Sequence, residues 1–187
     1  RDTRFFPSLL AAGLFLLPAP HVHAQTKKID LLNAGLIQSA PELGEGAQKL
    51  LHDVRFRHED AIMSCDSAYF FSKQFSLDAF SNVSIVQGDT LFLYGDKMHY
   101  DGEKKLAQFR RNVKLVDDST VLLTNYLDYN RETEIAYYYK GGNITQGENN
   151  LRSEIGYYHT GPEIFYFNDS VVIINPDYTI YSDSLKY

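Results

Sequence analysis

The segment DKMHY at residues 96–100 is one copy of a pattern that recurs about every thirty residues. The first residues of successive copies lie 30, 29, 29 and 29 positions apart. A period in this range is typical of stacked supersecondary units that bury a core only against their neighbours. The other copies are DSAYF at 66–70, NYLDY at 125–129, EIGYY at 154–158 and DSLKY at 183–187.

A second motif accompanies the first and consists of an Asn or a related residue followed by a β-branched residue. Because function in stacked arrays usually lies along a shared face, we expect no single catalytic cluster. In this alignment the last interval is short and the last copy has lost its Asn. The copies are Asp53-Val54, Asn82-Val83, Asn112-Val113, Asn143-Ile144 and Ser170-Val171.

Between the motifs, apolar residues alternate with polar ones and turn residues follow. Val83, Ile85 and Gln87 share one face of an extended chain, and alternation rich in Tyr, Phe, Val and Ile is typical of half-buried strands. Gly102 after Asp101 indicates a two-residue hairpin. Residues 29–32 suggest a strand and residues 40–46 a loop. The sequence predicts an all-β fold of stacked units with two strands each.

Aromatic residues are frequent, with 14 Tyr, 12 Phe and no Trp. One recurs at the end of each copy of the first motif, so stacking would align these residues as a ladder. Two interpretations follow: the rings fill a core, or part of the ladder lines a groove that is open to an apolar ligand. The ladder residues are Phe70, Tyr100, Tyr129, Tyr158 and Tyr187.

The N-terminus has the features of a secretory signal peptide at residues 1–24. Arg1 and Arg4 precede an apolar run at residues 5–17, and Val22-His23-Ala24 offers small residues for cleavage. The run is too short to span a bilayer. Residues 25–187 then form the repeat domain, which we expect to be incomplete at the C-terminus because the last copy stops within a unit.

Composition and motifs exclude several classes of function. The formal net charge of −6 argues against binding to nucleic acid or to an anionic membrane surface. The single Cys65 cannot form an internal disulfide, and we interpret it as a small buried apolar residue. No histidines have metal-binding spacing, and no nucleotide-binding or nucleophile motif occurs. We therefore expect no catalytic residues, no metal site, no cofactor and no enzyme activity.

The signal peptide, residues 66–68, the recurrent Asn-Val and residues 95–102 together resemble the OstA-like, LptA-type family. Those are periplasmic lipopolysaccharide-transport proteins, and the same module forms the N-terminal part of the outer-membrane translocon. The resemblance implies an open, slightly twisted antiparallel β-jellyroll in the periplasm. It also implies that lipid A acyl chains lie between two sheets, and that modules join end to end by strand pairing.

The resemblance and the alternation together predict which side chains face an apolar groove. A one-residue β-bulge would turn any of them to the other face. The predicted groove residues are Val54, Phe56, Ala68, Phe70, Val83, Ile85, Met98, Tyr100, Val113, Leu115, Leu127, Tyr129 and Ile144.

Two other functions remain open at this point. A secreted β-solenoid that binds or cleaves polysaccharide would use carboxylates from adjacent coils, and the repeated acids at 66, 96 and 183 would supply them. A structural, adhesin-type repeat would have a closed and tightly filled core. Turn and strand-end acids more often satisfy backbone groups than perform catalysis.

Overall fold

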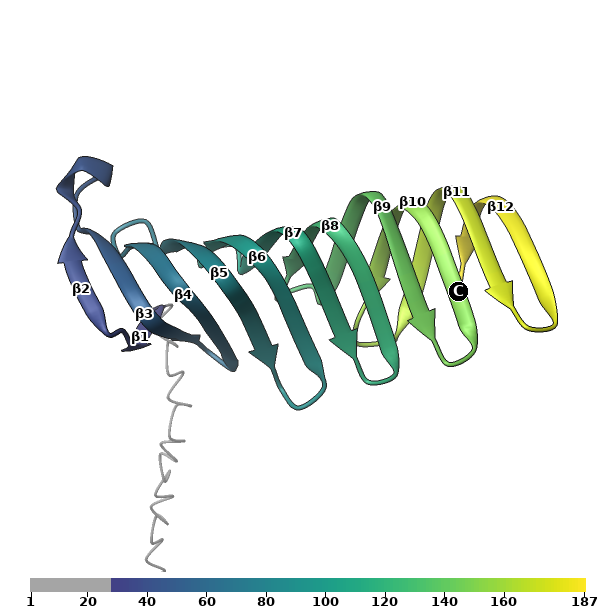
Figure 1. Ribbon diagram of the computed structural model, residues 1–187, viewed down its shortest axis with the longest axis horizontal. Coiled ribbons are helices and arrows are strands. Elements are labelled where there is room, and N and C mark those ends of the chain that lie inside the picture. The colour runs from purple at the N-terminus through teal and green to yellow at the C-terminus, as the bar shows by residue number, and fades with distance from the viewer. Residues whose placement is uncertain (1–27) are drawn as a thin grey trace, which may run out of the picture.

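Consecutive strands lie side by side in chain order along the long axis of the molecule (Figure 1). The computed structural model describes residues 28–187. Every pairing is antiparallel, and the two ends of the sheet do not meet. The predicted all-β, open antiparallel architecture is therefore confirmed. The long strands are β3 Ala47–His58, β4 Ala61–Phe71, β5 Ser76–Gln87, β6 Leu91–Asp101, β7 Leu106–Asp117, β8 Thr120–Asn130, β9 Ile135–Gln146, β10 Asn149–His159, β11 Ile164–Asn175 and β12 Tyr178–Lys186.

The N-terminal end of the sheet is less regular. The short strands β1 (Asp30–Asn33) and β2 (Leu36–Ser39) both pair with β3. A 3-10 turn, η1 (Pro41–Leu43), lies in the predicted loop. The expected signal peptide at residues 1–24, and residues 25–27 of the expected domain, lie outside the described residues.

Every second strand has a corner, and the recurrent Asn-Val motif marks it in β5 and β7. Arg111 and Asn112 have φ angles of 67° and 50°, a left-handed conformation that Asn tolerates better than most residues. Asn112 Nδ2 also donates a hydrogen bond to Asp96 Oδ2 at 2.8 Å, as Asn82 does to Asp66. Two of the repeated acids therefore brace corners. Equivalent left-handed pairs lie at 52–53, 81–82, 140–141 and 169–170.

The corner of β9 corrects the alignment made from the sequence. Asn143 was matched to Asn112, but it pairs with Leu123 on the opposite side from Lys114, so Asn143 is the equivalent of Lys114. The corner lies two residues earlier, and Gly141 adopts a φ of 92° without a Cβ penalty. With this correction the short interval before residue 170 disappears.

The intervening strands bend opposite these corners, where the register of each strand pairing shifts. In β6 the shift lies between Tyr94 and Lys97, and the buried positions change parity from Leu93 to Met98. Three steps from Tyr94 to Lys97 face four steps from Arg110 to Lys114, so the extra residue lies in the odd-numbered strand. The predicted groove residues Met98 and Tyr100 both lie after the shift in β6, so they share the inward face.

The hairpin turns form two rims. The first rim consists of the turns after β3, β5, β7, β9 and β11, and the second rim of those after β4, β6, β8 and β10. The two-residue hairpin predicted at Asp101-Gly102 is wrong, because that turn spans residues 102–105. Gly102 N instead donates to Phe75 O at 2.7 Å. The first-rim turns are 59–60, 88–90, 118–119, 147–148 and 176–177; the second-rim turns are 72–75, 102–105, 131–134 and 160–163.

Because each strand bends near its middle, the sheet folds over one apolar interior and brings the two rims together. A single cluster of buried apolar residues runs from Ile29 to Ile173. Among residues 28–187, no helix is long and apolar enough to cross a membrane.

Candidate functional site

The predicted groove residues all face this interior. Phe70 is the most exposed at 9%, and the others are essentially buried. Their shared facing follows from the alternation, whereas their contact with lipid stays a prediction. The set is Val54, Phe56, Ala68, Phe70, Val83, Ile85, Met98, Tyr100, Val113, Leu115, Leu127, Tyr129 and Ile144.

The interior contains further side chains that the prediction omitted. Many come from the other half of the odd-numbered strands, upstream of each corner, and others come from the first half of the even-numbered strands; the same alternation was present in the sequence at both places. They include Leu50, Leu77, Ala79, Ala107, Phe109, Ala136 and Tyr138.

The bend near the middle of each strand divides the sheet into two parts, which we call half-sheets. Side chains from both half-sheets fill the interior. Tyr100, Tyr129, Tyr138 and Tyr158 are among the largest fully buried residues, and the Tyr158 and Phe165 rings stack at 4.0 Å between centroids. Of the two interpretations of the aromatic ladder, core filling describes this conformation. Tyr158 and Phe165 belong to paired strands, so their stacking could persist, but a ligand between the half-sheets would have to separate the buried side chains that meet there.

Ladder tyrosines also connect the two rims. Each reaches from a strand end on the second rim to a polar side chain near the first rim, about forty residues earlier in the sequence. We call this line of contacts the seam. The hydroxyl oxygens of Tyr100, Tyr129, Tyr158 and Tyr187 lie 2.7, 3.4, 2.8 and 2.9 Å from side-chain atoms of His58, Gln87, Asp117 and Asn149.

Arg131 is the most connected residue of the seam, and its side chain is only 2% exposed. Its Nη1 donates to the Tyr100 hydroxyl at 2.7 Å, and its Nη2 donates to Asp60 Oδ1 at 2.5 Å. Burial and the nearby Arg131 lower the pKa of His58. In the neutral tautomer with Nδ1 unprotonated, His58 accepts a hydrogen bond from the Tyr100 hydroxyl, so the hydrogen bonds run in one direction from Arg131 through Tyr100 to His58.

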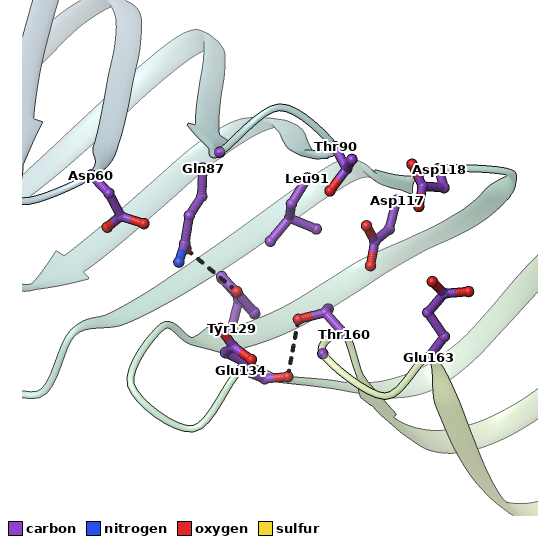
Figure 2. Close-up of a pocket in the computed structure, with 12 residues that line it drawn as sticks. Asp60, Gln87, Thr90, Leu91, Asp117, Asp118, Tyr129, Glu134, Thr160 and Glu163 are labelled. Carbon is purple, nitrogen blue, oxygen red and sulfur yellow. Dashed lines mark hydrogen bonds between the residues drawn. The ribbon is translucent and has the colours of Figure 1, made fainter.

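A hollow of about 370 Å³ lies further along the seam (Figure 2). Asp117 and Asp118 line it from the first-rim side, and Glu134 and Glu163 line it from the second. Burial raises the pKa of Asp117, although Tyr158 donates a hydrogen bond to its carboxylate. The seam was not predicted from the sequence. The only sign of it there is a polar residue, such as Gln87, at the end of an inward-facing alternation.

Within residues 28–187, the first rim is joined to the second through side chains alone. Backbone hydrogen bonds link successive turns of the second rim, for example from Arg131 N to Lys105 O at 2.9 Å and from Thr160 N to Glu134 O at 3.0 Å. In residues 28–187, no backbone ladder joins the first rim to the second. Separating the rims would therefore leave the sheet's own backbone hydrogen bonds intact.

Side chains suited to metal or thiol chemistry are not gathered in the described part of the chain. No group of three or more His, Cys, Asp or Glu residues there has a geometry that could hold a metal ion. Cys65 is buried, and burial raises the pKa of its thiol to about 11. A thiol with this pKa is a poor nucleophile at neutral pH.

Two-strand units stacked around one continuous apolar interior place this chain among the open β-jellyroll repeat proteins. The model of the OstA-like protein family matches residues 26–183. The chain therefore belongs to the OstA-like family, which confirms the resemblance drawn from the motifs and agrees with the expectation of a protein that is not an enzyme.

A solved structure shows the same fold. The chain is similar to LptH from Pseudomonas aeruginosa, described as the LptA homologous periplasmic component of the conserved lipopolysaccharide transport device. The TM-score is 0.56 at 14% sequence identity, and the match covers 61% of this chain and 93% of LptH. No curated protein has a matching sequence.

Proposed function

We propose that this protein is a periplasmic module that carries or bridges lipopolysaccharide toward the outer membrane. The acyl chains of the lipopolysaccharide lie between the half-sheets, and its sugars remain outside the seam. Membership of the OstA-like family and the fold shared with LptH support this proposal. The signal peptide expected at residues 1–24 agrees with a periplasmic location. No catalytic step or cofactor is required.

The continuous apolar interior is the observation that carries the proposal. Hydrating an acyl chain costs about 0.8 kcal/mol per CH₂ group, so a carrier must shield the whole chain from water. Inward-facing residues from Val54 on β3 to Ile173 on β11 form one uninterrupted cluster. A long interior of this kind suits a chain that moves along it better than a single deep pocket would.

Binding requires the half-sheets to move apart, because their side chains fill the interior. The rims are held together by side-chain contacts such as those of Tyr158 and Arg131, so parting them leaves the strand ladders in place. This also distinguishes a carrier from an adhesin-type repeat, in which the filled core has no need to open.

We also propose that other β-jellyroll modules of the transport system pair with the end strands. The strand β12 is the last in the sheet order, and its Ile180 and Tyr181 are 40% and 77% exposed. Unpaired strand edges are ready sites for β-augmentation.

Site-specific photo-crosslinking in intact cells tests the carrier function. A benzophenone side chain replaces Phe56 or Phe109, which are buried and face inward, or Tyr94, which faces outward and is 41% exposed. All three native residues are aromatic, so the replacement is of similar character at each. Crosslinks to lipopolysaccharide are expected from the two inward positions and not from Tyr94. Equal crosslinking at all three, or none inside, would contradict the proposal.

The same experiment separates the alternative functions. A polysaccharide-binding solenoid would crosslink to sugar polymers from outward positions such as Tyr94. An adhesin-type repeat would give no lipid adduct at Phe56 or Phe109, because its core stays closed.

A further inference from the structure

The two halves of the seam differ in how their charges are arranged. In the N-terminal half, opposite charges face each other across the rims. Lys105 Nζ lies 3.0 Å from Glu59 Oε1, and Arg131 Nη2 lies 2.5 Å from Asp60 Oδ1. Both cations come from the second rim and both carboxylates from the first. Their attraction holds this half shut.

In the C-terminal half, like charges face each other. Asp117 and Asp118 on the first-rim side lie across the hollow from Glu134 and Glu163 on the second rim, and Figure 2 shows Glu163 directed toward the two aspartates. Asp60, the partner of Arg131, also lines the hollow at its N-terminal side, whereas no Lys or Arg does. Asp117 is buried, but Asp118, Glu134 and Glu163 are exposed, so the repulsion between these carboxylates is modest and depends on salt. It favours separation of the rims here.

We infer that the seam opens first at the acidic hollow, around Asp117 and Glu163, while Lys105 and Arg131 keep the other half closed. The hollow is then the mouth through which an acyl chain reaches the interior. The role of the hollow as a mouth for acyl chains rests on the proposed function, whereas the order of opening does not.

The hydrogen bonds agree with this order. At the border of the hollow, Gln87 Oε1 accepts a hydrogen bond from Arg131 Nε at 3.3 Å, and the Tyr129 hydroxyl lies 3.4 Å from the same oxygen, which is long for a bond between two oxygens. Inside the hollow, Tyr158 makes the bond to Asp117, a carboxylate that burial makes costly to ionise. Opening hydrates Asp117 and so offsets part of the loss of that bond.

Two engineered cysteines test the order of opening. Met63 on β4 and Leu122 on β8 occupy equivalent repeat positions, face inward and are 1% and 0% exposed. Each is replaced by Cys in a Cys65→Ala background, because Cys65 is the only native cysteine. The rate of alkylation by iodoacetamide is then measured in the native protein. Global unfolding exposes both thiols equally, so a difference between them reports local opening.

We expect Leu122→Cys to be alkylated roughly tenfold faster than Met63→Cys, since local openings differ widely in free energy within one protein. Added salt screens attraction and repulsion alike. It should therefore slow alkylation at position 122 and accelerate it at position 63. These opposite responses need no further substitution, so they remain measurable even if charge variants fold poorly.

Charge variants give a second measurement. Replacing Glu134 and Glu163 together by Gln should slow alkylation at position 122 and leave position 63 unchanged. Arg131→Gln should accelerate alkylation at position 63. Equal rates at the two positions, or the same direction of salt response at both, would overturn the inference.

The alkylation experiment contains no lipid, so it is independent of the crosslinking experiment. Polarised alkylation without lipid crosslinks would reject the role of the hollow as a lipid mouth and the carrier function together. Crosslinks with equal alkylation at positions 63 and 122 would reject only the order of opening.

Discussion

Gly156 is the position where a single methyl group should test the packing of the interior most directly. An added Cβ would lie 2.4 Å from Tyr138 Cε1 and 2.5 Å from its hydroxyl oxygen. Tyr138 is fully buried, and its hydroxyl lies 2.6 Å from Ser153 Oγ, so the ring cannot easily move away. The equivalent positions in other units hold Met98 and Leu127, so Gly156 is small because Tyr138 is large.

The expected cost of Gly156→Ala follows from two opposing effects. Overpacking a filled core typically costs about 1–3 kcal/mol. Replacing Gly by Ala within a strand returns about 0.5–1 kcal/mol, because the unfolded chain loses freedom. We therefore expect a net loss of roughly 1–2 kcal/mol in the free energy of unfolding.

A second substitution, at Tyr138, tests whether the clash with its ring causes this loss of stability. Tyr138→Leu removes the ring atoms that meet the new methyl group, and Ser153 keeps its hydrogen bond to Ile155 O at 2.9 Å. In the Tyr138→Leu background, Gly156→Ala should be neutral or stabilising. The coupling between the two changes should thus be on the order of 1–2 kcal/mol.

Urea unfolding followed by far-ultraviolet circular dichroism measures these changes. Both the midpoint and the slope must be compared, because repeat arrays can lose cooperativity. Ala68→Gly is the matched control, since Ala68 is the buried equivalent of Gly156 in the first unit, and it should destabilise. A Gly156→Ala protein as stable as the wild type, or costs that add without coupling, would refute the packing argument.

Three other changes probe the seam and the corners. Burial raises the pKa of Asp117 above its ordinary value of 3.8, so its folded form loses stability as the pH rises from that value through the raised pKa. Asp117→Asn should remove this loss and raise the urea midpoint at pH 7 relative to wild type, whereas an unchanged difference between acidic and neutral pH would contradict it. Arg131→Met leaves the Tyr100 hydroxyl and the Asp60 carboxylate without their donor, and it should cost about 1–3 kcal/mol in chemical unfolding. Asn112→Val should lower the melting temperature more than Asn112→Gly, because a β-branched residue at a φ of 50° costs about 1–2 kcal/mol and Gly does not; equal melting temperatures would argue against a left-handed corner in solution.

Local patterns predicted the strands and their inward faces well. The alternation around Val83 and Ile85 repeats on every other strand, and alternation alone fixes which side chains share a face. It did not locate the corner of β9, because Asn143 carried the expected motif while the left-handed pair lies at 140–141. Gly141 adopts a positive φ more cheaply than Asn does, so the backbone preference prevailed over the pattern.

The sequence by itself determined the period, the antiparallel strands and the apolar character of the interior, since these depend on residues that are neighbours in the chain or one unit apart. Only the tertiary structure decided that the interior is filled and that its rims meet. The seam joins residues such as Tyr158 and Asp117, or Arg131 and Asp60, which lie 41 and 71 positions apart. Their meeting depends on the summed bending of many corners, and no local pattern records that curvature.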